Sequence, residues 1–104
     1  MIQPLTGLLS DKDANVRAQA SATLGSCSNY PSQVVPFLLK SLNDTNQRVQ
    51  EMAAFALGNF GDESKPAVPL LLKMLSDPDP LLHLYTTNAL KAIDPQAAAK
   101  AGIK

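Results

Sequence analysis

The residues of this sequence that could do chemistry are few and far apart. The only histidine is His83, and the only cysteine is Cys27. Nucleophilic catalysis needs a cysteine or serine within hydrogen-bonding reach of a base, and no spacing in this sequence suggests such a pair. A single cysteine also excludes an intrachain disulfide and a metal site built from several cysteines. We therefore predict that the chain is not an enzyme.

Two short acidic segments are the remaining candidates, as ligands for a metal ion. Asp11 and Asp13 are separated by one residue, and so are Asp77 and Asp79. Calcium takes roughly six to eight oxygen ligands, more than either segment offers. An aspartate that precedes a helix can instead accept hydrogen bonds from the free N–H groups of the first turn. We interpret these aspartates as turn and cap residues, and predict neither a metal nor a cofactor.

Composition argues against further classes of partner. The chain has 104 residues, 45% of them hydrophobic, with nine basic and nine acidic side chains. This balance of charge disfavours general electrostatic capture of nucleic acid or anionic lipid. No window approaches the roughly 18 apolar residues of a membrane span, and the N-terminus shows no signal-peptide pattern. We expect a cytoplasmic protein without nucleic-acid or membrane partners.

The chain is built from a repeated unit. An offset of 33 residues separates Asp11, Asp44 and Asp77. In each copy the aspartate follows a pair of leucines that are four residues apart, namely Leu5 and Leu9, Leu38 and Leu42, and Leu71 and Leu75. The same offset relates Val16, Val49 and Leu82, and then Leu24, Leu57 and Leu90. Apolar residues in one register over three copies indicate a solenoid, whose units bury their apolar faces by stacking.

Each copy is predicted to be a pair of helices joined by a polar turn. Proline fits the first turn of a helix, where its missing N–H is not needed. The first helices are predicted to begin near Pro4, Pro36 and Pro69. Asparagine and aspartate are good N-caps, and the second helices are predicted to follow Asp13, Asn46 and Asp79. Apolar residues at i, i+4, i+8 and i+11 place a stripe on one face of each second helix.

The matched residues carry a resemblance to a known family. The pattern Pro-x-Leu-x-x-x-Leu-x-Asp-x-x-x-x-Val-Arg-x-x-Ala-x-x-x-Leu-Gly is similar to the HEAT repeat, and closest to the short bacterial kind related to phycobilisome lyases. The first copy carries it at Leu5, Leu9, Asp11, Val16, Arg17, Ala20, Leu24 and Gly25. The resemblance implies an all-α fold, a right-handed α-α superhelix of three HEAT-like helix pairs. We expect a single domain, 1–104, with repeats at about 1–31, 32–65 and 66–104.

The family's arginine after the valine is present only once. It is Arg17 in the first copy, and the matched residues are Gln50 and His83. In similar folds this arginine pairs with the turn aspartates of the stack. The resemblance therefore implies a structural ladder made of Arg17, Asp11, Asp44 and Asp77. We predict that Arg17 pairs with Asp11 or Asp44.

The second helices differ most on the side that their helical angles turn away from the apolar stripe. The resemblance places this side on the concave face, and exposed apolar residues gathered on one face favour binding. The candidate protein-binding residues are Ala18, Ala22, Glu51, Met52, Phe55, Leu84, Tyr85 and Asn88. Phe55 and Leu84 would anchor a partner, and Glu51 and Asn88 would supply polar selectivity. In an alternative interpretation, Met52 and Tyr85 pack between neighbouring repeats.

The predicted function is a scaffold that binds an unidentified protein or peptide on the face of the second helices. Two alternatives stay open. The resemblance to the lyase group implies an accessory subunit of a bilin lyase-like enzyme. Solenoids need polar caps, and neither end of the sequence shows a clear one, so the chain could also be a self-associating fragment of a longer solenoid.

Overall fold

The computed structural model describes residues 11–26 and 31–103, which contain helices and no strand. The elements are α2 (Ala14–Leu24), α3 (Pro31–Leu42), α4 (Gln47–Gly58), η1 (Gly61–Ala67), α5 (Val68–Met74), α6 (Pro80–Ile93) and α7 (Pro95–Lys100). The helix predicted to begin near Pro4, and Cys27, lie outside the described residues. The predicted all-α architecture is confirmed. The division into three repeats at the stated boundaries stays a prediction.

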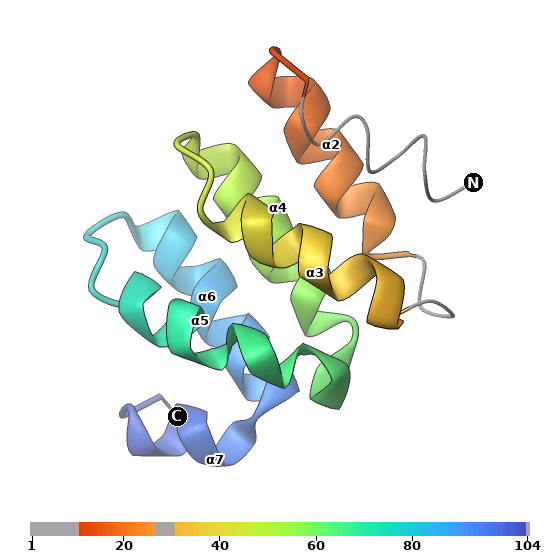
Figure 1. The fold of residues 1–104 in the computed structure, drawn as a ribbon. Coiled ribbons are helices and arrows are strands. Elements are labelled where there is room, and N and C mark those ends of the chain that lie inside the picture. Colours follow the sequence, from red (N-terminus) through yellow and green to blue (C-terminus); the bar gives the residue numbers. More distant parts are fainter. Residues whose placement is uncertain (1–10, 27–30, 104) are drawn as a thin grey trace.

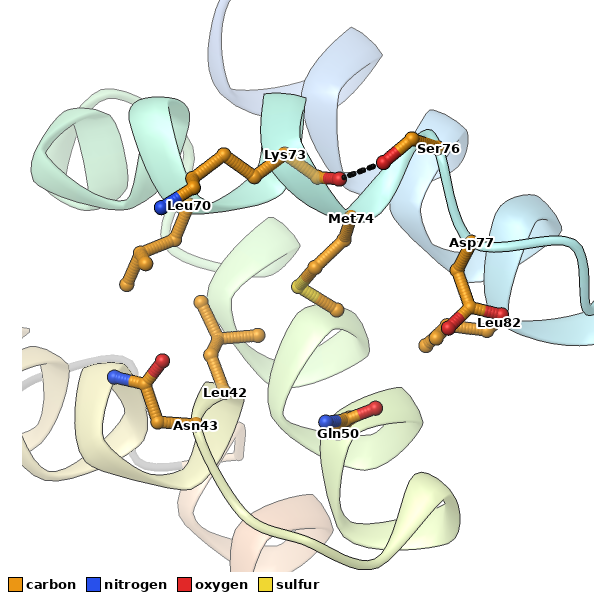
Figure 2. A pocket seen from close by; sticks show the side chains of 9 residues that line it. All are labelled: Leu42, Asn43, Gln50, Leu70, Lys73, Met74, Ser76, Asp77 and Leu82. Carbon is orange, nitrogen blue, oxygen red and sulfur yellow. Dashed lines mark hydrogen bonds between the residues drawn. The ribbon is translucent and has the colours of Figure 1, made fainter.

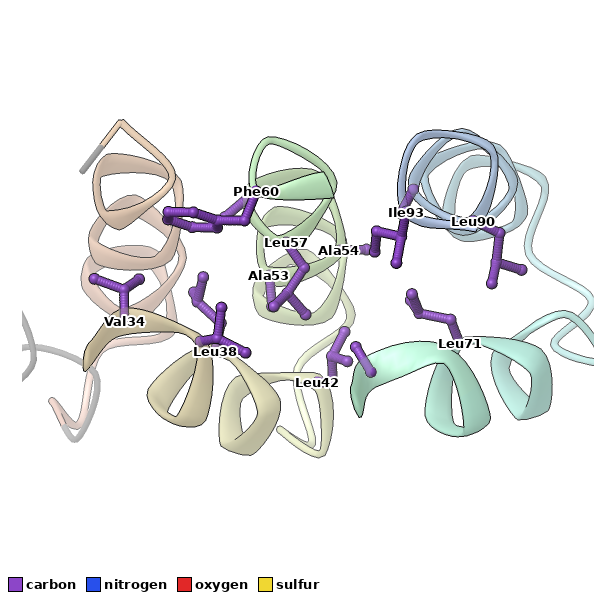
Figure 3. Packing of buried hydrophobic residues seen from close by; sticks show 14 of the residues in the cluster. Val34, Leu38, Leu42, Ala53, Ala54, Leu57, Phe60, Leu71, Leu90 and Ile93 are labelled. Carbon is purple, nitrogen blue, oxygen red and sulfur yellow. The ribbon is translucent and has the colours of Figure 1, made fainter. Parts of the chain in front are cut away.

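The helices form two layers (Figures 1 and 3). The second helices α2, α4 and α6 lie side by side in one layer, because α4 packs against both of its neighbours. The first helices α3 and α5 form the other layer, where α3 packs against α4 and α5 against α6. This arrangement is the stacking of helix pairs that the repeat predicts.

A layer of leucines fills the space between the two rows of helices (Figure 3). Leu38 of α3 and Leu71 of α5 point toward Leu57 and Leu90 of the second helices, and all four are fully buried. Burying one leucine side chain contributes roughly 1.5–3 kcal/mol. The stripe predicted for the second helix of the second copy is buried throughout: Val49, Ala53 and Leu57 in α4, and Phe60 just beyond its end. The period of the sequence therefore places the core correctly.

The turn between the helices of a pair has the same construction in each copy. The first aspartate accepts a hydrogen bond from the N–H two residues later: Asp11 from Asp13 at 2.8 Å, Asp44 from Asn46 at 2.8 Å, and Asp77 from Asp79 at 2.9 Å. The residue two positions after the first aspartate caps the second helix with its side-chain oxygen. Asp13 accepts a hydrogen bond from the N–H of Asn15, Asn46 from that of Val49, and Asp79 from that of Leu81. The aspartates of the two acidic segments thus stabilise the turns and cap the second helices.

The first helix of the second pair begins earlier than the sequence predicts. Helix α3 starts at Pro31, so Pro36 lies inside the helix. The additional turn buries Val34 and Val35. Their burial offsets the backbone hydrogen bond that an internal proline removes. Pro36 itself is exposed, so its ring lies on the solvent side of the helix.

The connections that follow α4 and α6 are themselves helical. The segment from Gly61 to Lys65 belongs to the 3-10 helix η1, which continues directly into α5. The segment after Asp94 forms α7, which packs against α6. At the offset of 33 residues Pro95 matches Asp62. Helix α7 is therefore the counterpart of η1, not of α5.

Replacing Ser21 with alanine is expected to stabilise the protein by about 1 kcal/mol. Ser21 is fully buried in α2, and within residues 11–26 and 31–103 its hydroxyl oxygen has no hydrogen-bond partner. An unpaired buried polar group costs about 1–3 kcal/mol, and the matched residue of α4 is Ala54. Urea denaturation of both proteins measures the difference. An S21A protein that unfolds at lower urea concentration would contradict the expectation.

Candidate protein-binding face

Two aromatic side chains meet on the outer surface of the second-helix layer. Phe55 of α4 and Tyr85 of α6 are in edge-to-face contact, with ring centroids 6.4 Å apart and ring planes at 87°. Such a pair contributes roughly 0.5–1.5 kcal/mol beyond its buried area. Phe55 nevertheless keeps 48% of its surface exposed, whereas Tyr85 is half-buried. An exposed ring that a neighbouring helix holds in place is preorganised for contact with a partner.

The aromatic pair borders a groove between α4 and α6. Its cavity has a volume of about 320 Å³ and is lined by Phe55, Gly58, Asn59, Tyr85, Asn88, Ala89 and Ala92. The small residues leave the floor open, since Gly58 has no side chain and the two alanines have one methyl group each. Asn59 and Asn88 supply amide groups beside the rings. An apolar groove with a few polar groups is the usual construction of a binding site.

Two of the residues predicted to bind a partner are buried in the stack. Ala18 and Glu51, which match each other at the 33-residue offset, are only 4% and 3% exposed. Glu51 accepts a hydrogen bond from Gln47 Nε2 at 2.8 Å and lies 3.8 Å from the Arg48 guanidinium. The angle of a residue from the apolar stripe indicates only whether that residue faces the first helices. Inside the stack, the second helix of one repeat is also covered on another side, where the second helix of the next repeat packs against it.

Gly25 shows which side of α2 contacts α4. Gly25 directly follows α2 and lies seven residues, or about two helical turns, after Ala18, so both point to the same side. A Cβ built on Gly25 would be 2.9 Å from the Cα of Ala56 in α4. The face that contains Ala18 therefore contacts α4. Leu84 is the counterpart of Ala18 and Glu51 in α6, and it is 53% exposed because no second helix follows it in the described chain.

Five of the remaining six candidates line three different cavities. Tyr85, Phe55 and Asn88 share the groove between α4 and α6. Met52 lines a smaller cavity of about 160 Å³ between α2 and α4, together with Asn15, Ala18, Gln19 and Arg48. Leu84 lines a third cavity with Leu75, Pro80 and Ile103 at the other side of α6. Ala22 is partly buried. The eight candidates thus do not line a single groove.

The sequence interpretation missed Asn59. It is the residue after α4, it is exposed, and its Nδ2 donates to the carbonyl oxygen of Gly25 at 3.3 Å. This hydrogen bond ties the end of α4 to the end of α2 and places the amide at the groove. Its matched residues are Ser26 and Ala92. The signal that could have identified it is a single large amide in a column of small residues.

Arg17 connects the first two turns of the stack. Its Nε donates to Asp44 Oδ2 at 2.9 Å, and its Nη2 to Asp44 Oδ1 at 3.2 Å. Its Nη1 donates to the carbonyl oxygen of Asp11 at 2.7 Å. Both aspartates predicted as partners therefore contact Arg17. Asp44 accepts hydrogen bonds with its carboxylate, and Asp11 accepts one with its backbone carbonyl oxygen. Bidentate arginine–carboxylate pairs are among the stronger hydrogen-bonded contacts in proteins.

The pair also changes the acidity of the carboxyl group. Partial burial of Asp44 acts to raise its pKa, but hydrogen bonds from Arg17 and from the N–H of Asn46 outweigh it. The net result is a pKa below the ordinary value of 3.8. Asp44 is therefore fully ionised at neutral pH, as an ion pair with Arg17 requires.

The stacked helix pairs define the class of protein, an all-α solenoid of short helical repeats. A family model described as HEAT repeats matches residues 35–101, and a second, described as HEAT repeat, matches residues 1–30. The chain belongs to the HEAT repeat family. HEAT repeats are helical scaffolds that typically mediate protein interactions and are generally not enzymes. No curated protein matches the chain.

Solved structures with a similar fold include two engineered proteins. The crystal structure of one, a Northeast Structural Genomics Consortium target, has a TM-score of 0.76 and 27% identity, over 97% of this chain and 51% of that chain. Another target of the same consortium has a TM-score of 0.69 and 26% identity, over 97% of this chain and 30% of that chain. The present chain thus spans about half of the first engineered protein and less than a third of the second.

The described residues contain neither a membrane-spanning helix nor a cluster of metal-binding side chains. Among residues 11–26 and 31–103, no helix is long and apolar enough to cross a membrane. In the same part of the chain, no group of three or more histidine, cysteine, aspartate or glutamate side chains could hold a metal ion.

Proposed function

We propose that this protein is an interaction scaffold that binds a protein or peptide in the groove between α4 and α6. The observation that carries the proposal is Phe55, which is 48% exposed while Tyr85 fixes its ring at the border of an open groove. Aromatic residues at the centre of an interface commonly carry most of the binding free energy. An apolar side chain of the partner would enter the groove beside Phe55.

The polar groups of the groove would orient the partner. Asn59 and Asn88 lie at the groove, and each offers an amide donor and acceptor. Backbone groups of a bound segment need hydrogen-bond partners when they are taken out of water. The two amides can provide them, while the rings of Phe55 and Tyr85 contact apolar side chains. Asn88 keeps the role of a selectivity residue that the sequence suggested, whereas Glu51 does not have it.

Replacing Phe55 with serine is expected to weaken binding of a natural partner by at least about tenfold, because the central apolar anchor is lost. A partner is first captured from source cells with the wild-type protein, and its Kd is then measured by calorimetry against purified variants. The matched control is Leu81→Ser, since Leu81 is another exposed apolar residue, 45% exposed, on α6 and outside the groove. Equal affinities of F55S and L81S would exclude the groove as the binding site.

Leu84 favours a second candidate function, self-association through the end of the stack. It is exposed beside Leu75 and Ile103 in a cavity of about 630 Å³. Its counterparts Ala18 and Glu51 are covered by the next second helix, so a second copy of the chain could cover Leu84 in the same manner. Sedimentation at several concentrations separates the two functions. Concentration-dependent mass that disappears in Leu84→Ser supports self-association, and a constant monomer mass contradicts it.

A further inference from the structure

The arginine contact that joins the first two turns of the stack is incomplete at the next turn. Gln50 stands at the position of Arg17, and its Nε2 donates to the carbonyl oxygen of Asp44 at 2.7 Å. Arg17 makes the equivalent bond to the carbonyl oxygen of Asp11, also at 2.7 Å. Glutamine thus reproduces the contact within its own repeat. It lacks the second contact, in which Arg17 reaches the carboxylate of the following turn.

The carboxylate left without this contact is Asp77. Its Oδ1 accepts the N–H of Asp79 at 2.9 Å, as the Oδ1 of Asp44 accepts the N–H of Asn46 at 2.8 Å. The two carboxylates therefore have the same local arrangement. Asp44 is paired with Arg17, whereas no lysine, arginine or histidine of the described residues forms an ion pair with Asp77, which is exposed.

A cavity lies where the second arginine would be. Its volume is about 360 Å³, and it is lined by Leu42, Asn43, Gln50, Leu70, Lys73, Met74, Ser76, Asp77 and Leu82. Figure 2 shows Asp77 at one side and the apolar side chains of Leu42 and Met74 across the middle. The side chain of Lys73 extends toward the side of the view away from Asp77. The cavity thus has an apolar wall for an aliphatic stem and a carboxylate at one end.

We propose that this cavity binds an arginine side chain of a partner polypeptide, whose guanidinium pairs with Asp77. The planar guanidinium matches a carboxylate with two parallel N–H donors, and its three-carbon stem can lie along apolar surface. The contact between Arg17 and Asp44 is the internal example of this recognition. Lysine carries a compact, more strongly hydrated charge, so arginine is the preferred ligand.

This site is separate from the groove that carries the proposed function. The cavity lies among the end of α3, the end of α5 and the turn before α6, whereas the groove lies on the outer side of α4 and α6. No residue lines both. A variant of Phe55 therefore leaves the arginine site intact, and the two proposals can fail independently.

The test is a titration of isotope-labelled protein with N-acetyl-arginine N-methylamide, followed by NMR. Saturable shifts are expected for Gln50, Asp77 and Leu82, with a Kd on the order of millimolar, since one side chain supplies few contacts. The lysine analogue is expected to bind at least about threefold more weakly. Shifts that rise linearly without saturation, or equal binding of both analogues, would overturn the proposal.

Two variants make the test specific. Asp77→Asn removes the charge and is expected to lower affinity for the arginine analogue at least about fivefold, whereas Asp62→Asn, at another exposed aspartate, leaves it unchanged. Gln50→Arg supplies the guanidinium internally, so it is expected to abolish binding of the analogue and to raise Tm. Wild-type affinity in either D77N or Q50R contradicts the proposed site, and F55S is expected to bind the analogue as the wild type does.

Discussion

Gly25→Ala is expected to destabilise the protein by about 2 kcal/mol, although alanine is the better helix former. A Cβ at residue 25 would lie 2.9 Å from both the Cα and the Cβ of Ala56. The obstacle includes backbone, so α2 and α4 must move apart to admit one methyl group. Gly25 has ordinary helical backbone angles, φ −62° and ψ −19°, so alanine meets no strain of its own there. Thermal and urea unfolding measure the loss.

Gly58 provides the matched control, because it stands at the same position of the next repeat. A Cβ there would lie 3.4 Å from the Cα of Ala89, at the limit of ordinary contact. Gly58→Ala is therefore expected to be neutral or stabilising by about 0.5 kcal/mol, through the lower backbone entropy of alanine in the unfolded chain. The two substitutions are chemically identical, so a similar effect at both positions would show that helix contact distance does not decide the outcome.

Arg17→Gln is expected to lower Tm by about 5 °C. The substitution reproduces the residue that the second repeat already has at this position. Glutamine can keep the hydrogen bond to the Asp11 carbonyl, as Gln50 does to Asp44. It cannot reach the carboxylate of Asp44, whose side chain is only 15% exposed and would then be left without its ion pair. Arg48→Gln is the control, since that arginine is largely exposed.

The same pair predicts a dependence of stability on pH. The pKa of Asp44 in the folded protein lies below its ordinary value of 3.8. The unfolded state therefore takes up the proton first as pH falls, and the stabilisation is present above pH 3.8 and lost as pH falls through the lower pKa of the folded state. The difference in unfolding free energy between wild type and Asp44→Asn should shrink over that acidic range. A difference that stays constant down to the lowest accessible pH would contradict the assignment.

The repeat of the sequence was sufficient to predict the fold. Leucines such as Leu38, Leu57 and Leu71 recur in register, and each is buried where the helical period places it. The start of α3 was predicted incorrectly, because the rule that proline begins a helix applies to both Pro31 and Pro36. Only packing decides between them. The turn before Pro36 carries two valines that the core can bury.

The candidate site was predicted in part. Helical angle separates the core stripe from the rest of a helix, and so it identified the outward positions of Phe55 and Asn88. It cannot separate the outer surface from the side that contacts a parallel neighbour. Glu51 is buried in α4, which packs against α6. Leu84 lies on the same side of α6 and is exposed, so the difference comes from position in the stack and not from local sequence.

The single arginine rung has a mechanical consequence. In a solenoid each repeat is coupled mainly to its neighbours. Arg17 joins the first two turns, whereas among the described residues no arginine joins the next two turns, and a cavity lies beside Gln50 and Asp77. We therefore expect the junction between the second and third helix pairs to bend more easily than the junction that Arg17 joins. If the cavity binds an arginine side chain as proposed, the bound guanidinium would join these two turns in the way that Arg17 joins the first two.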